Sequence, residues 1–402
     1  MRSIRGHLLT PTSRGSWREE RDAVLHVGAD GRIESIGRSA GGGRHLLVPG
    51  FVDAHAHVPQ HAICGVPAGR LLEWLRRLVF PREARDRGEG AERFFREALR
   101  HGTVAGAFYS SAWPESAEAC RAAMERLGVR GWIGMPLMDL FTYRPDLARL
   151  PLRARTRRVI GELESVLRRD GRVRTAVTPR FALSCSDELL EAAGSFPQPV
   201  QTHISEQPDE VSAARRRGRD YLAVYERAGL VRRESIYAHG IWLTASEWTR
   251  LRRAGATVAH CPTSNLFLGS GVMDWKAAWK GHVALGTDVG AGPSLSMYDV
   301  MRASWASHLA KSGTAPSARM LLEAATVGGA CAIGEPLGCL EPGRPATLQV
   351  LDRDAILAGE ADSLDDLLSR IVHRGGAHAI RAVYVDGKKV KLATASGARY
   401  ES

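Results

Sequence analysis

The sequence lacks the segments that would carry it into or across a membrane. No apolar run reaches the ~18 residues that a transmembrane helix needs, and the Arg-rich start from Met1 to Arg5 has no apolar stretch typical of a signal peptide. The six cysteines are scattered, and none belongs to a Cys-x-x-Cys pair, which argues against a redox motif. We therefore expect a cytoplasmic protein with reduced thiols and no membrane partner.

Aromatic residues are also scarce, at 6% of the chain, and they do not alternate with the basic clusters. The formal charge of +11 comes mainly from arginine, in clusters such as residues 153–158 and 215–219. Acidic residues are interleaved with these clusters, as on a solvated helix face. Without aromatic side chains on which bases stack, the charge does not indicate a nucleic-acid binding protein.

The chain does contain a long alternation of strand-like and helix-like segments. A first strand runs from Leu46 to Val52 and on to His57, and a helix over Leu71–Phe80 is expected to stop at Pro81. Eight such βα units predict an α/β fold with a parallel, closed (β/α)8 barrel of the TIM type. The later strands are expected at residues 103–108, 129–135, 173–178, 200–203, 236–239, 257–260 and 282–287.

Both ends of the chain have β character. Strand-like segments at residues 23–27 and 32–36 flank Asp30-Gly31, a hairpin turn signal, and the tail has strand-like segments at 347–351, 382–385 and 388–390. Each end is too small to be stable alone. We therefore expect a small composite β domain from residues 1–47 and 337–402 beside a barrel at 48–336.

Two histidines end the first barrel strand. Residues i and i+2 of a strand point to the same side, so His55 and His57 project together. Three later strands also end in metal-ligand residue types, at His203, His239 and Asp288. Strand ends of a barrel meet at one face, where His55, His57, His203 and Asp288 would offer three nitrogens and a carboxylate. This donor set with an open position is typical of a catalytic zinc site.

The motifs around these residues resemble those of the amidohydrolase superfamily and, within it, the guanine deaminase family. The resemblance covers nearly the whole chain, to the C-terminal VYVDGKKV. HAH and the late Asp are shared by the whole superfamily, whereas TPRFALSCS is much more specific. The matching motifs are PGFVDAHAHVPQ, LLEWLRRLVFPRE, TPRFALSCS, HISEQPDEV, YAHG, HCPTSN and GTDVGAG.

The resemblance assigns roles to individual residues. It implies that one zinc ion per chain is bound, with Fe2+ as the alternative metal, by His55, His57, His203 and Asp288. Glu206 is then the proton shuttle. His239 lies beside the metal-bound water, and Asp288 takes a proton from that water. The purine is held by Gln60, Arg180 and Phe181. Zinc lowers the pKa of a bound water towards ~7, so the assignment is chemically consistent.

The resemblance implies hydrolysis of guanine to xanthine and ammonia by a cytoplasmic homodimer. The sequence departs from the usual guanine deaminase motifs at two places, and both concern which substrate is bound. Residues 60–71 form a shorter segment than is usual in that family, and GTDVGAG stands where an Ala-Gly-Gly order is commoner. One alternative is therefore a deaminase of another aminated heterocycle, such as a triazine, 8-oxoguanine or a pterin. A second alternative is a catalytically silent assembly protein with this fold, although buried His and Asp are costly to keep without a metal.

Overall fold

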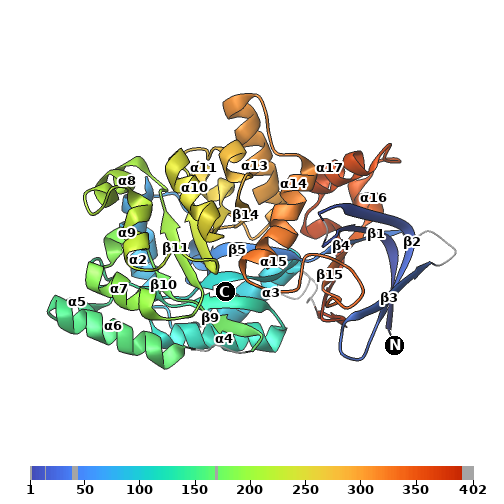
Figure 1. Cartoon of the computed structure of the whole chain (residues 1–402). Helices are drawn as coiled ribbons and strands as arrows, with labels where there is room; N and C mark the ends of the chain where they lie inside the picture. Colours follow the sequence, from blue (N-terminus) through green and yellow to red (C-terminus); the bar gives the residue numbers. More distant parts are fainter. Residues whose placement is uncertain (1, 14, 39–43, 168–170, 392–402) are drawn as a thin grey trace.

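The computed structural model describes residues 2–13, 15–38, 44–167 and 171–391. It consists of a parallel barrel with surrounding helices, and a separate twisted sheet formed by the two ends of the chain (Figure 1). Within these residues, no helix has both the length and the apolar character needed to cross a membrane.

The barrel strands follow one another in chain order, and every pair is parallel. A bridge between Val177 and Val200 joins the two halves of the barrel. The seam between the first and last strands is closed because Asp288 N–H donates to His55 O and His57 N–H donates to Val289 O, each at 2.8 Å. The predicted barrel is therefore confirmed, with strands β5 (Phe51–His57), β6 (Thr103–Tyr109), β7 (Arg130–Gly134), β9 (Val173–Thr175), β10 (Thr178–Pro179), β11 (Val200–Ile204), β12 (Ser235–His239), β13 (Thr257–His260) and β14 (His282–Leu285).

Helices cover the outside of the barrel, and their ends follow local sequence signals. The α10 helix begins after Thr244, whose side chain and that of Glu247 bond reciprocally to each other's backbone N–H groups. Gly128 and Gly255 end α4 and α10 in the left-handed conformation. The main helices are α3 (Ala91–Arg100), α4 (Pro114–Leu127), α6 (Leu152–Val166), α7 (Asp187–Ser195), α8 (Pro208–Arg215), α9 (Tyr221–Arg227), α10 (Ala245–Ala254), α11 (Pro262–Phe267), α13 (Met297–Ser312) and α14 (Ala318–Glu323).

The second sheet has seven strands in the order β17-β16-β15-β4-β1-β2-β3. Strands from the two chain ends pair directly, since β15 runs antiparallel to β4. The strands are β1 (Arg2–Pro11), β2 (Trp17–Val27), β3 (Ile33–Arg38), β4 (His45–Pro49), β15 (Leu348–Asp352), β16 (Ile380–Val385) and β17 (Lys388–Lys389). The composite sheet is thus present, whereas the domain boundaries at residues 47 and 337 stay a prediction. Strand β1 and helix α17 (Leu364–Arg374) were not predicted.

The expected single strand from Leu46 to His57 is wrong, because Gly50 divides it into two. Strand β4 before it belongs to the composite sheet, and β5 after it belongs to the barrel. A Cβ atom at Gly50 would lie 2.5 Å from a methyl group of Val104, so the close approach between the two sheets requires glycine.

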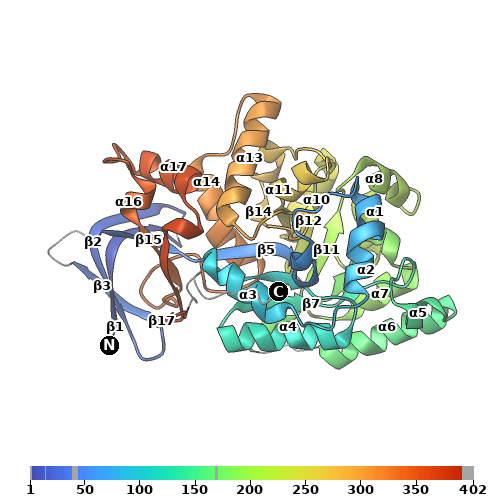
Figure 2. The same cartoon turned by 180° about the vertical axis from the view of Figure 1, so that it is seen from behind.

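The helical segment over residues 71–83 also differs from its prediction, because it continues past Pro81. It consists of α1 (Leu71–Trp74), a π-helical turn (Leu75–Val79) and α2 (Phe80–Glu83). The wider π turn, just ahead of Pro81, adapts the helix to a residue that lacks an N–H donor. Trp74 and Leu75 of this segment pack in one apolar cluster with Leu268 and Ala291. Figure 2 shows α1 and α2 at the side of the barrel away from the composite sheet.

Candidate active site and metal centre

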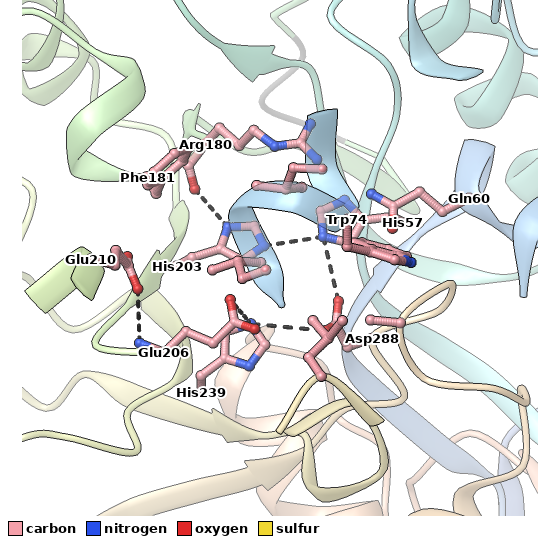
Figure 3. Close-up of a pocket in the computed structure, with 14 residues that line it drawn as sticks. His57, Gln60, Trp74, Arg180, Phe181, His203, Glu206, Glu210, His239 and Asp288 are labelled. Carbon is pink, nitrogen blue, oxygen red and sulfur yellow. Dashed lines mark hydrogen bonds and ion pairs between the residues drawn. The ribbon is translucent and has the colours of Figure 1, made fainter. Parts of the chain in front are cut away.

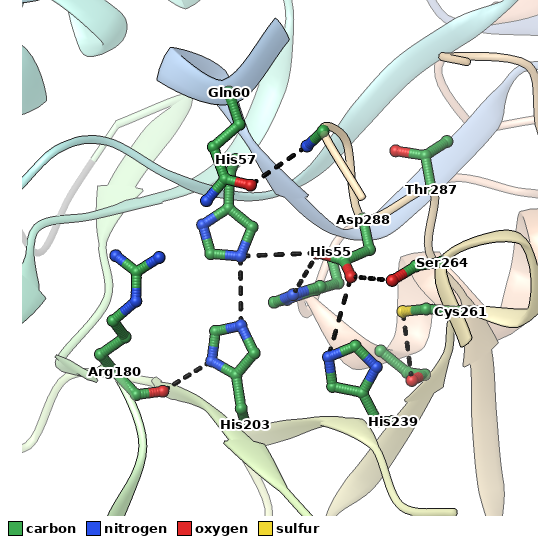
Figure 4. Close-up of polar contacts among 12 residues, drawn as sticks. His55, His57, Gln60, Arg180, His203, His239, Cys261, Ser264, Thr287 and Asp288 are labelled. Carbon is green, nitrogen blue, oxygen red and sulfur yellow. Dashed lines mark hydrogen bonds and ion pairs between the residues drawn. The ribbon is translucent and has the colours of Figure 1, made fainter. Parts of the chain in front are cut away.

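Four side chains that lie on, or just after, three barrel strands converge at the C-terminal ends of those strands. The ligand cluster, defined as His55, His57, His203 and Asp288, has its ligand atoms within 4.8 Å of one another. His57 Nε2 lies 3.1 Å from His203 Nε2, and Asp288 Oδ1 lies 3.2 Å from His55 Nε2 (Figure 4). The structure thus brings together the four residues that the sequence marked as ligands.

The protonation states of the ligand cluster suit a cation. Burial lowers the pKa of His55, His57 and His203, which keeps the three imidazoles neutral. Burial alone would raise the pKa of Asp288, but the close approach of His55, at 3.2 Å, together with His239 and His203 outweighs it and holds that pKa well below its usual range. The cluster therefore offers neutral nitrogens and an ionised carboxylate.

Lone pairs in the cluster also point at the common centre. His203 Nδ1 donates to the carbonyl oxygen of Arg180 at 2.6 Å, which leaves the lone pair on Nε2. His55 Nε2 is buried and has no hydrogen-bond partner within the described part of the chain. An unsatisfied buried nitrogen is costly unless a ligand is bound. Three nitrogens and one carboxylate oxygen are a donor set that zinc accepts, so the residues fit this metal.

His239 and Glu206 lie on the opposite side of Asp288 from Gln60 (Figure 3). His239 Nε2 is 3.5 Å from Glu206 Oε2 and 3.8 Å from Asp288 Oδ2, while its Nδ1 pairs with Asn265 Oδ1 at 2.9 Å. Burial alone would lower the pKa of His239, but the two carboxylates raise it overall. Burial raises the pKa of Glu206 to about 7, so this carboxyl group can both hold and release a proton near neutrality.

A further carboxylate fixes the backbone beneath Glu206. Glu210 Oε2 accepts from the N–H groups of Glu206 and Gln207 at 3.0 and 3.3 Å. The same bonds begin helix α8, because Gln207 is its N-terminal cap. The sequence predicts Glu210 in the first turn of a helix that begins at Pro208, but sequence reasoning did not select it as a site residue.

Backbone strain is concentrated at this site. Ser205, His239 and Asp288 have φ values of 51°, 75° and 47°, in the left-handed region that glycine favours. Such residues cost about 1–3 kcal/mol each and persist where the surroundings require them. Here they turn the strand ends so that side chains face the pocket.

The three residues expected to hold a purine line the same pocket. Gln60 and Arg180 are each only 2% exposed, so Arg180 is not a surface arginine, and Phe181 is 6% exposed. Both Arg180 and Gln60 bond to Glu83, which the sequence analysis did not select. Together Gln60, Arg180 and Glu83 form the recognition group. The only sequence signal for Glu83 was the motif LLEWLRRLVFPRE, whose last residue it is.

Comparison with known proteins identifies the family. Residues 46–390 match the profile of the Amidohydrolase family. The chain belongs to the amidohydrolase family. Within this family it is 33% identical to the guanine deaminase of Escherichia coli (strain K12) over 367 residues, which cover 86% of this chain and 83% of that protein. It therefore belongs to the guanine deaminase family as well.

Solved structures of deaminases superpose over nearly the full chain. The E. coli guanine deaminase has a TM-score of 0.88 at 30% identity, covering 97% of this chain and 99% of that one. A guanine deaminase from C. acetobutylicum with bound guanine has a TM-score of 0.86 at 25% identity, with 96% and 99% covered. An adenosine deaminase from Xanthomonas campestris with bound zinc has a TM-score of 0.81 at 27% identity, with 96% and 92% covered.

Proposed function

We propose that this protein hydrolyses guanine to xanthine and ammonia. The observation that carries the proposal is the position of the recognition group: a buried arginine and a buried glutamine line the same pocket as His57, His203 and Asp288 of the ligand cluster. Water would add at C2 of the purine, and the 2-amino group would leave as ammonia.

The residues of the ligand cluster would hold one zinc ion per chain, which when bound makes a water molecule nucleophilic at neutral pH. Asp288 Oδ2 would take a proton from the attacking water, with His239 Nε2 orienting it. Glu206, whose pKa of about 7 leaves it partly protonated at neutral pH, would donate to a ring nitrogen and later to the departing amine. Each of these three residues lines the pocket.

Donors in the pocket would select guanine over adenine. Arg180 carries only donors, and Gln60 already uses its oxygen to accept from Gly290 N–H at 3.2 Å. Guanine offers O6 as an acceptor, whereas adenine places a donating amino group there. Sites built around such hydrogen bonds reject analogues that cannot form them by ~10⁴ or more. Phe181 would stack on or flank the purine ring.

The test is ammonia release together with the absorbance change from guanine to xanthine, using zinc-loaded protein. The panel includes adenine, cytosine, 8-oxoguanine, a pterin and an amino-triazine. Guanine turnover without adenine or cytosine turnover supports the proposal. Turnover of another heterocycle in place of guanine rejects the substrate, and fully zinc-loaded protein that acts on none of them favours a silent assembly protein.

The proposal extends to the metal, assembly and location of the protein. Metal analysis would separate zinc from Fe2+, and one ion per chain is expected because one ligand cluster is found among the described residues. The sequence analysis predicts a cytoplasmic protein, and the family resemblance implies a homodimer acting in purine catabolism. Light scattering of the purified protein tests the dimer directly.

A further inference from the structure

Glu83 is a completely buried carboxylate at the end of α2, on the helical segment over residues 71–83. Its oxygens accept from Arg180 Nη1 at 2.5 Å, Arg180 Nη2 at 3.1 Å and Gln60 Nε2 at 2.7 Å. Arg180 and Gln60 come from different parts of the barrel, so Glu83 is the group that links them.

These bonds fix which atoms Gln60 presents to the pocket. Its Nε2 donates to Glu83 and its Oε1 accepts from Gly290 N–H at 3.2 Å, so a flip of the carboxamide would break both bonds. One N–H of Nε2 remains for a ligand. Gln60 therefore acts as a donor, although the side chain of glutamine can serve as either donor or acceptor.

The same carboxylate fixes Arg180. The two Nη atoms form a fork with the two oxygens of Glu83, a geometry that restricts the guanidinium plane. Arg180 also lies over the ring of Phe80, with 5.3 Å from Cζ to the ring centroid. Its remaining N–H groups then have a defined direction, and its charge is balanced inside the protein.

We propose that Glu83 is a positioning residue that makes Gln60 and Arg180 a rigid pair of donors for the O6 side of the purine. This inference rests on the proposed function, because it concerns recognition of guanine. Glu83 does not act on the reacting atoms: its effect passes through the two residues that it holds.

A carboxylate is required at this position. Glu83 accepts from three donor atoms of Gln60 and Arg180, whereas a carboxamide in its place has one acceptor oxygen and an NH2 group that would face donors. In Glu83→Gln, the new NH2 group can donate to Gln60 Oε1 if Gln60 flips, which reverses what Gln60 presents to the pocket. Glu83→Asp keeps the charge but is shorter by one methylene, so it cannot reach all of these donors at once.

The experiment compares guanine with 2-aminopurine, which keeps the 2-amino group but has hydrogen in place of O6. For each zinc-loaded variant we measure ammonia release and take the ratio of kcat/KM for the two substrates. In Glu83→Gln this ratio should fall ~10- to 100-fold, the range for losing hydrogen bonds to a charged group. The loss should lie mainly in KM for guanine, with zinc content unchanged. Glu83→Asp, which still balances Arg180, should show a smaller fall.

The matched control is Glu73→Gln. Glu73 lies on the same helical segment and does not line the pocket, and the substitution removes its exposed ion pair with Arg77 (2.9 Å). It should keep the wild-type ratio. If Glu83→Gln and Glu83→Asp lose activity equally on both substrates, or keep the wild-type ratio, Glu83 is merely structural and the inference is wrong. If the wild type does not turn over guanine, the proposed function itself fails, and the role of Glu83 in guanine recognition fails with it.

Discussion

The ligand cluster and the recognition group both contribute side chains to one pocket, yet their hydrogen bonding differs. In the ligand cluster His55 Nε2 has no hydrogen-bond partner within the described residues, and two imidazole nitrogens face each other at 3.1 Å. In the recognition group, the carboxylate of Glu83 and both polar atoms of Gln60 are already paired. The first group is arranged for an ion that completes it, while the side chains of the second are already held in place by one another before a substrate binds.

This difference shows how two sets of residues in one pocket divide two tasks, metal binding for the reaction and recognition of the substrate. Metal ligands need free lone pairs, and the hydrogen-bond partner of His203, Arg180 O, accordingly lies on the far side of its ring. Recognition needs fixed donors, so the polar ends of Gln60 and Arg180 are held by other side chains. Variants in the first group should change metal binding and rate, and variants in the second should change substrate preference.

The largest effect is expected from removing two ligands at once. His55→Ala/His57→Ala should abolish zinc retention and deaminase activity, because two of the four donors are lost. The barrel should still fold, since its apolar core does not depend on these side chains. Metal analysis and circular dichroism check this outcome. A chelator should lower the Tm of the wild type but not that of the variant, and full zinc occupancy in the variant would contradict the ligand assignment.

The next effect separates proton transfer from metal binding. Glu206→Gln should keep zinc but reduce kcat by ~10²–10⁴-fold, the range for a lost general acid or base. Because burial raises the pKa of Glu206 to about 7, wild-type kcat should fall as the pH rises above that value and Glu206 loses its proton. The variant should lack this alkaline limb. Loss of zinc from Glu206→Gln, or near wild-type turnover, would show that Glu206 has another role.

A third variant pair tests whether stability and recognition can be separated. Arg180→Ala leaves Glu83 as a buried charge without its counter-ion, and such a change costs about 3–5 kcal/mol of unfolding free energy. Adding Glu83→Gln should recover part of that loss, because the unpaired charge is removed. The kcat/KM for guanine should stay low in both proteins. Calorimetry and the ammonia assay measure the two effects, and recovered guanine turnover in the double variant would mean that Arg180 acts only through folding.

The same comparison explains what could be predicted from the sequence. Each residue of the ligand cluster lies near or just beyond the end of a strand whose apolar pattern is visible, and barrel geometry then brings the strand ends together. Neither signal was present for Glu83. The helix was expected to stop at Pro81, before Glu83, and the residues to which Glu83 bonds are distant in the chain. The strand across Gly50 was misassigned for a related reason, since the need for glycine arises from a tertiary contact with Val104.

The smallest effect is expected at a contact that supports the ligand cluster from outside. Ser264 Oγ donates to Asp288 Oδ2 at 2.6 Å and so orients the carboxylate without occupying a ligand position. Loss of such a partner typically costs about 10–100-fold in metal affinity or activity. Ser264→Ala should therefore weaken zinc binding by ~10- to 100-fold, and saturating zinc should restore most of the turnover. Thr263→Ala is the matched control on the same helix, because within the described residues its hydroxyl donates only to Thr287 O, at 3.5 Å. If turnover stays low at saturating zinc, Ser264 acts on the reaction through the Asp288 carboxylate rather than on metal affinity.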